Sequence, residues 1–117
     1  MERRSKYGSK KTTYNGKKYD SKKEAQRAVE LELLESAGKI FNLKSQVHIE
    51  LFPAFTYEGK KIRSIVYVAD FTYNDPFGIH VIEDSKGFKT KEYLLKKKLL
   101  LYKIASGEFH DTIFLET

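Results

Sequence analysis

The feature that most constrains the fold is a pair of apolar segments, residues 62–73 and 79–86, joined by a turn-rich stretch. That stretch, residues 74–78, reads Asn-Asp-Pro-Phe-Gly and is dense in turn-forming residues. Segments rich in Val, Ile, Tyr and Phe and bounded by turns are typical of strands, so we expect two adjoining strands. Asp70 lies in the first and Asp84 in the second. A carboxylate in an apolar strand is costly unless something compensates its charge.

Capping and stop signals predict two helices. Ser21 is followed three residues later by Glu24, which is a capping-box pattern, and Gly38 fits a helix stop. The apolar residues between them are spread around the helix rather than confined to one stripe, which predicts a largely buried helix. Thr90 can cap a second helix that runs to about residue 105.

The remaining segments predict strands and turns. Asn-Gly between β-forming residues indicates a hairpin at the N-terminal side of the first helix. Apolar and polar residues alternate over residues 46–52, and a last short strand covers residues 112–115. The expected order is helix, three strands, helix, strand (αβββαβ), an α/β (α+β) class. We expect one domain over residues 1–117, with a flexible basic arm at residues 1–11.

The alternation of side chains along a strand indicates whether Glu83 or Asp84 lies on the same face as Lys86. Asp84 and Lys86 point the same way because strand side chains alternate, whereas Glu83 points to the opposite face. Asp84 is therefore the better metal-ligand candidate and Glu83 the better structural residue. Asp70 shares the face of Asp84 only if the intervening turn has an odd number of residues.

Two acids and a lysine on adjoining strands are one way to build a site for metal-assisted phosphodiester hydrolysis. Two neighbouring carboxylates repel each other unless a cation lies between them, and Mg²⁺ prefers such oxygen ligands. Lys86 could position a water or neutralise charge on the phosphate. A structural ion pair between Asp84 and Lys86 is the alternative, and spacing alone leaves both open. Acid-any-Lys triplets also start at Asp20 and Glu58, but these lie at a helix cap and in a turn.

Charge is unevenly distributed along the chain. Residues 1–23 carry nine Lys/Arg and two acids, and residues 86–103 carry seven and one. The two basic blocks favour a polyanionic partner such as DNA, although lysine-rich surfaces also confer solubility. Cysteine is absent, which excludes disulfides and thiolate metal sites, and the three histidines are scattered. With neither a secretory signal nor a membrane span expected, we predict a cytoplasmic protein.

The order of elements, with Asp70 followed by Asp84-x-Lys86, resembles the PD-(D/E)XK nuclease superfamily. Residues 67–71 and 82–87 are similar to phage junction-resolving endonuclease I, and the whole chain resembles short phage-encoded members. The similarity extends from about Lys6 to the C terminus. Ala69 stands where the name-giving proline would be, and Asp84 replaces the commoner glutamate.

The resemblance implies roles for five residues. Asp70 and Asp84 match the two metal-binding acids, and Lys86 matches the catalytic lysine. Glu24 matches the helix glutamate that completes many such sites, and the backbone carbonyl of Ser85 is a further metal ligand. For Glu24, the capping-box role is the alternative, since one side chain cannot easily fill both.

We therefore expect a Mg²⁺-dependent endonuclease, with Mn²⁺ able to substitute, that acts on branched DNA such as a four-way junction. Two coordinated nicks from one site per chain imply a homodimer. The alternatives are a nickase or repair-type endonuclease on duplex DNA and a non-catalytic DNA-binding module. The expected DNA-binding residues are Arg3, Arg4, Lys6, Lys10, Lys11, Lys89 and Lys91.

Overall fold

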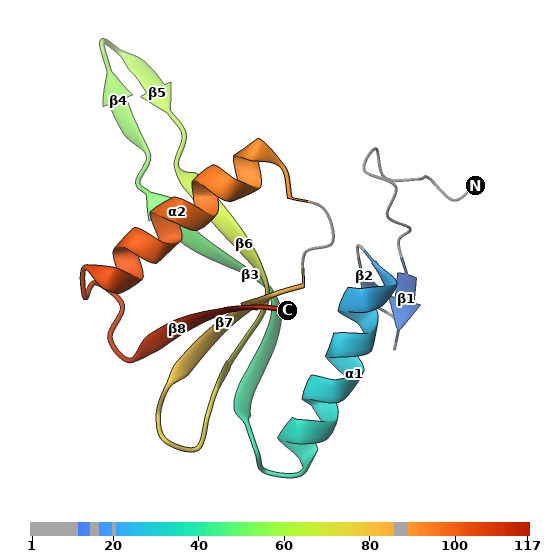
Figure 1. The fold of residues 1–117 in the computed structure, drawn as a ribbon. Helices are drawn as coiled ribbons and strands as arrows, with labels where there is room; N and C mark the ends of the chain where they lie inside the picture. Colours follow the sequence, from blue (N-terminus) through green and yellow to red (C-terminus); the bar gives the residue numbers. More distant parts are fainter. Residues whose placement is uncertain (1–11, 15–16, 20, 86–88) are drawn as a thin grey trace.

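The computed structural model describes residues 12–14, 17–19, 21–85 and 89–117 (Figure 1). The predicted arm at residues 1–11 lies outside the described residues. The elements in chain order are β1 (Thr12–Tyr14), β2 (Lys17–Tyr19), α1 (Lys22–Ser36), β3 (Phe41–Phe52), β4 (Phe55–Tyr57), β5 (Lys60–Ile62), β6 (Ile65–Asn74), β7 (His80–Asp84), α2 (Lys91–Ala105) and β8 (Thr112–Glu116).

A four-stranded mixed sheet, in the order β3-β6-β7-β8, forms the centre of the fold. β3, β6 and β7 pair antiparallel, and β8 joins β7 in parallel after the chain has crossed over through α2. The described chain is thus α+β, and the predicted αβββαβ order is confirmed. The predicted N-terminal hairpin is also present as the separate two-stranded pair β1–β2.

Both helices begin where the sequence predicted. The Ser21 side chain accepts a hydrogen bond from the Glu24 backbone N–H, and Thr90 caps α2 in the same way. The expectation of a largely buried α1 is wrong, because only one face of it is covered. Its buried residues lie along one stripe, whereas Leu33 and Leu34 are 66% and 37% exposed. Neither helix in the described chain is long and apolar enough to cross a bilayer.

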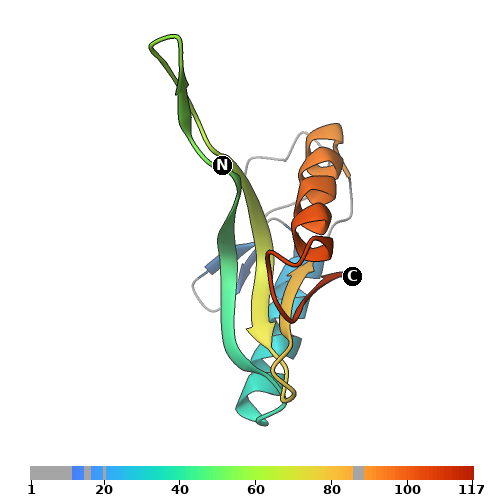
Figure 2. The same ribbon diagram turned by 90° about the vertical axis from the view of Figure 1, so that its left-hand side faces the viewer.

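The strand bounds differ from the sequence predictions in two places. The strand predicted at residues 46–52 already begins at Phe41. The strand predicted at residues 62–73 is divided between β5 and β6, because β4 and β5 form their own hairpin. That hairpin projects away from the main sheet in both ribbon views (Figures 1 and 2).

Two apolar clusters lie on the sheet, and β6 contributes to both. Tyr67 and Ala69 pack with Leu100 of α2, whereas Phe71 and Tyr73 pack with residues of α1. The change of cluster falls at Asp70, between these two pairs. Strict alternation would keep all four on one face, so the strand is locally irregular at this point.

Candidate functional site

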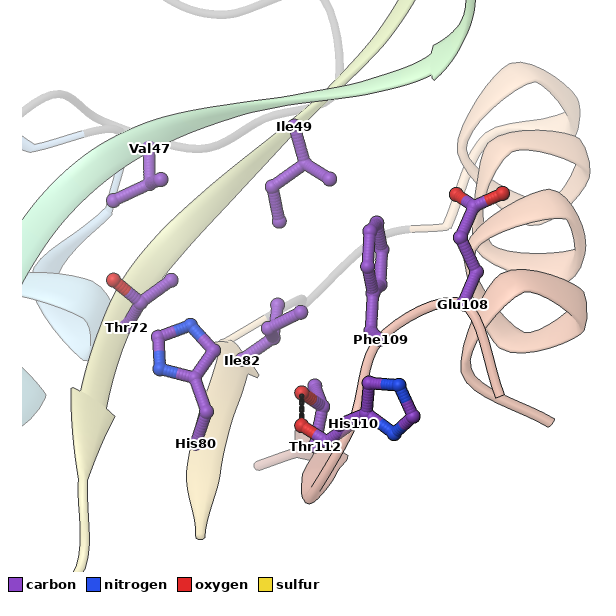
Figure 3. Close-up of a pocket in the computed structure, with 9 residues that line it drawn as sticks. All are labelled: Val47, Ile49, Thr72, His80, Ile82, Glu108, Phe109, His110 and Thr112. Atoms are coloured by element: carbon purple, nitrogen blue, oxygen red, sulfur yellow. Dashed lines mark hydrogen bonds between the residues drawn. The ribbon is translucent and has the colours of Figure 1, made fainter. Parts of the chain in front are cut away.

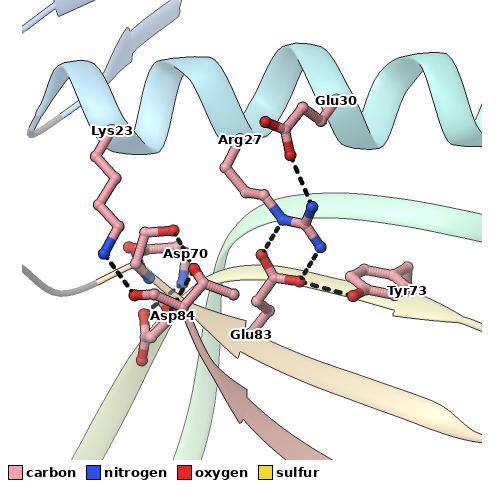
Figure 4. Close-up of polar contacts among 9 residues, drawn as sticks. Lys23, Arg27, Glu30, Asp70, Tyr73, Glu83 and Asp84 are labelled. Atoms are coloured by element: carbon pink, nitrogen blue, oxygen red, sulfur yellow. Dashed lines mark hydrogen bonds and ion pairs between the residues drawn. The ribbon is translucent and has the colours of Figure 1, made fainter.

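The two predicted aspartates lie together on adjoining strands. The register pairs Phe71 with Glu83 and Asn74 with His80, which leaves five residues in the turn and sets Asp70 against Asp84. The odd turn length that the sequence argument required is therefore met. Asp84 Oδ1 accepts a hydrogen bond from the Asp70 N–H at 3.0 Å, and Asp70 Oδ2 accepts one from the Ser85 N–H at 2.7 Å (Figure 4).

Burial makes this pair unusual. Asp84 is fully buried, Asp70 is 3% exposed and Ser85 is 6% exposed. Transfer of carboxylates out of water is costly, and backbone N–H donors offset part of that cost. The pair lies where β7 ends, beside the last residues of β8, because the Thr117 N–H donates to the Asp84 carbonyl at 2.8 Å. The site is thus oxygen-rich, and it is formed by the interior of β6 and the ends of β7 and β8.

Glu24 approaches from α1 and is 2% exposed. Gln46 Nε2 donates to its Oε2 atom at 2.7 Å. Gln46 lies between Ser45 and Val47, whose partners Phe71 and Ala69 flank Asp70, so it is level with that acid in the sheet. Its φ of 53° is in the left-handed region that non-glycine residues rarely adopt.

The burial of Glu24 bears on the capping-box alternative. The Ser21 half of the pattern is present, and the Glu24 carboxylate also accepts a hydrogen bond from Gln46 of β3. Among the described residues, no three His, Cys, Asp or Glu side chains are grouped closely enough to hold a metal. The predicted role of Glu24 as a metal ligand stays a prediction.

Glu83 has the structural position that alternation predicted for it. It is fully buried, and Arg27 of α1 donates to its two oxygens at 2.5 and 2.9 Å. The Tyr73 hydroxyl donates to Glu83 Oε1 at 2.6 Å. The hydrogen bonds to Glu83 raise the pKa of Arg27, and burial followed by the Glu83 contact raises that of Tyr73 to about 12. Arg27 also donates to Glu30 at 2.9 Å, so the cluster contains four hydrogen bonds between protein side chains (Figure 4).

Basic residues lie close to the end of β8, and two of them, Lys23 and Lys97, were not predicted from the sequence as site residues. Lys23 Nζ donates to the Thr117 carbonyl at 2.7 Å, which brings the first turn of α1 to the end of β8. Glu116 lies opposite Asp84 in the parallel register and forms ion pairs with Lys89 at 2.8 Å and Lys97 at 3.2 Å. These contacts could not be found from linear spacing, because they join residues up to 94 positions apart.

Glu116 also accepts a hydrogen bond from the Tyr93 hydroxyl at 2.5 Å. Lys89, then Tyr93, lower the pKa of the Glu116 carboxyl to about 2. Burial raises the pKa of Tyr93, and the hydrogen bond to Glu116 and the charges of Asp84 and Asp70 raise it further. Tyr93 of α2 is therefore within electrostatic reach of both aspartates.

The other predicted site residues divide into two groups. Lys86 lies outside the described residues, as do Arg3, Arg4, Lys6, Lys10 and Lys11. Lys89 is held by Glu116, and Lys91, the first residue of α2, is exposed. Of the competing triplets, the one at Glu58 lies in the tight β4–β5 turn, as predicted, with positive φ at Glu58 and Gly59. Asp20 of the other triplet lies outside the described residues.

A cavity lies at the beginning of β7 and β8, at the other end of these strands from Asp84 and Glu116 (Figure 3). This cavity of about 460 Å³ is lined by four apolar residues, among them Ile82 and Phe109, and by polar residues that include His80, His110 and Glu108. His80 and Thr112 begin β7 and β8, whereas Asp84 and Glu116 end them. Burial lowers the pKa of His80. The cavity gathers two of the histidines that are scattered in the sequence, but it is separate from the aspartate pair.

The fold and the site define an α+β domain with two buried aspartates on adjoining strands, one inside β6 and one at the end of β7. The family model described as "Protein of unknown function (DUF1064)" matches residues 4–113, and the chain belongs to this family. The chain has no match among the curated proteins or the solved structures.

Proposed function

We propose that this protein is a metal-dependent DNA endonuclease that hydrolyses phosphodiester bonds. The observation that carries the proposal is the contact between two buried aspartates on adjoining strands, Asp70 and Asp84. The resemblance of the Asp70 and Asp84-x-Lys86 pattern to PD-(D/E)XK nucleases supports the same conclusion.

The donors present fit Mg²⁺ rather than a soft metal. Asp70 and Asp84 supply carboxylate oxygens, Ser85 adds a backbone carbonyl, and the chain has no cysteine. Mg²⁺ is commonly held by one or two carboxylates plus waters and substrate phosphate, so a closed cage of three side chains is not required. When bound, the metal would lower the pKa of a coordinated water and polarise a phosphoryl oxygen. Mn²⁺ is expected to substitute.

The residues of the chain have complementary roles in this proposal. Asp70 and Asp84 would hold the cation, and Glu24 would complete the metal site from the α1 side. Lys86 would neutralise charge on the phosphate as the attacking oxygen approaches. Lys89 and Lys91 precede and begin α2, where a helix N-terminus also favours an anion. These two lysines and the N-terminus of α2 would attract a DNA phosphate to the end of α2 that follows β7.

We further propose branched DNA, such as a four-way junction, as the substrate and a homodimer as the acting form. Both follow from the resemblance and from the need for two coordinated nicks. The arginines and lysines of residues 1–11 would add phosphate contacts. The proposal places the enzyme in the cytoplasm, which is that of the host if the protein is phage-encoded.

The direct test compares wild type with Asp84→Asn on a labelled four-way junction and on a linear duplex of matched sequence, each with Mg²⁺ or EDTA. We expect paired nicks in the junction that need Mg²⁺. Asp84→Asn should lower the cutting rate more than about 100-fold, because partners that only orient metal ligands already contribute roughly 10- to 100-fold.

Asp111→Asn is the matched control. Asp111 is exposed and has a positive φ of 49°, which asparagine tolerates, so this variant should cut like wild type. Equal cutting of junction and duplex would favour a nickase or repair-type enzyme. DNA binding without cutting in Mg²⁺ or Mn²⁺ would contradict the nuclease and favour a binding module.

A further inference from the structure

The projecting β4–β5 hairpin carries unpaired positive charge. Its strand β5 begins with Lys60 and Lys61, and Arg63 follows directly after it. All three side chains are exposed, and none forms an ion pair with any described residue. Most lysines of α2 differ in this respect, since Lys96, Lys97 and Lys103 are each paired with an acid.

The hairpin register distributes these cations over both faces. Tyr57 pairs with Lys60 and Phe55 with Ile62, so these four share one face, whereas Lys61 lies on the other with Thr56. Phe55 and Tyr57 are 46% and 63% exposed. The hairpin is thus a narrow two-stranded ribbon with cations on both faces and an aromatic ring beside one of them.

A ribbon of this size needs a partner. Two strands of three residues are marginal by themselves, and here the exposed side chains add little packing. At the base, Phe52 and Phe55 meet edge to face with ring centres 6.0 Å apart, which fixes the direction of the hairpin. The hairpin is therefore held out from the sheet with most of its surface uncovered.

We propose that the β4–β5 hairpin inserts into a groove of the DNA substrate, a proposal that rests on the proposed function for the identity of the partner. The major groove of B-DNA, about 12 Å wide, admits a two-stranded β-ribbon. Its walls are phosphate backbones that the cations on both faces can meet. A second copy fits less well, because a symmetric contact would bring identical positive hairpins together.

The distance to the aspartate pair sets where this contact falls. Lys60, the more distant of the two lysines, is ten residues from Asp70. At about 3.3 Å per extended residue, the backbone at Lys60 lies no more than about 33 Å from the acids. With a rise of about 3.4 Å per base pair, this corresponds to roughly ten base pairs from the cut.

The test measures DNA affinity in EDTA, where cutting is absent, for wild type and for Lys60→Gln/Lys61→Gln. A fluorescent junction with arms of 15 base pairs is titrated at several salt concentrations. Loss of two phosphate contacts should weaken binding roughly 10- to 100-fold at 0.1 M salt and lower the salt slope by about 1.8. Lys60→Arg/Lys61→Arg should retain the wild-type values.

Lys39→Gln/Lys44→Gln is the matched control, since it removes two exposed lysines at the opposite end of β3. Equal losses in both double variants would overturn the hairpin contact. So would a hairpin variant that changes only the oligomeric state, measured by sedimentation, because that identifies a second copy as the partner. If the hairpin variant cuts DNA as well as wild type does, this inference is refuted and the proposed nuclease activity stands. If DNA binding depends on the hairpin lysines but wild type cuts no DNA, the proposed nuclease activity is refuted and this inference stands.

Discussion

Glu83 and Asp84 are consecutive, fully buried acids on β7, yet their surroundings differ completely. Glu83 faces Arg27 and Tyr73, which satisfy both of its oxygens. Asp84 faces a second aspartate, Asp70, on the adjoining strand, and the two are linked through backbone N–H groups. Because strand side chains alternate, one step along the chain separates a closed polar cluster from an acidic pair.

The difference teaches how burial of charge can be interpreted. A buried acid with a bidentate arginine is compensated within the protein and stabilises one arrangement of α1 on the sheet. Two adjacent buried acids repel each other when both are charged, and a bound cation favours their charged forms. Neutralisation of Glu83 should therefore lower stability, whereas only the acidic pair should respond to Mg²⁺.

The largest expected effect is on the closed cluster. Glu83→Gln should lower the free energy of unfolding by about 3 kcal/mol, since it leaves the partly buried Arg27 without its main partner. Urea unfolding at neutral pH measures this. Glu30→Gln is the control, because Glu30 meets the same arginine but is 62% exposed, and it should cost under about 0.5 kcal/mol. Similar losses in the two variants would show that burial of the Glu83 pair is not what matters.

The acidic pair should respond to cation instead. Mg²⁺ at ten times its dissociation constant should raise the free energy of unfolding by about 1.4 kcal/mol in wild type without DNA. Glu83→Gln should retain this increase, and Asp84→Asn should lose it. Urea unfolding with and without Mg²⁺ is the measurement, at constant ionic strength. An equal increase in Asp84→Asn would place the bound cation elsewhere.

Much of this comparison was accessible from sequence. Period-two alternation separated Asp84 from Glu83, and the five-residue turn set Asp70 against Asp84. Local signals such as Ser21 and Thr90 also located both helix starts, because capping depends on residues only three positions apart.

The errors arose where long-range packing decides. The spread of apolar residues in α1 suggested burial all round, but the helix covers only one side of the sheet and leaves Leu33 exposed. The partners of the acids, Arg27 for Glu83 and Gln46 for Glu24, come from other elements and have no spacing signal. The face change of β6 at Asp70 likewise breaks the alternation that sequence reasoning assumes.

The smallest expected effect concerns the hydroxyl that completes the closed cluster. Tyr73→Phe should lower the free energy of unfolding by about 1 kcal/mol at neutral pH, because one hydrogen bond to a buried carboxylate is lost. The pKa of Tyr73 is raised to about 12 in the folded protein, so this contribution is fully present below the unfolded value of about 10. It should disappear as the pH rises from 10 to 12.

Unfolding of wild type and Tyr73→Phe at pH 7 and between pH 10 and 12 measures that convergence. Tyrosinate absorbance should independently lose one group that titrates near pH 12 in the variant. Tyr57→Phe is the control, since Tyr57 is 63% exposed and has no acid partner among the described residues. A stability difference between wild type and Tyr73→Phe that persists unchanged to pH 12 would mean that the hydroxyl contributes through packing and not through its hydrogen bond to Glu83.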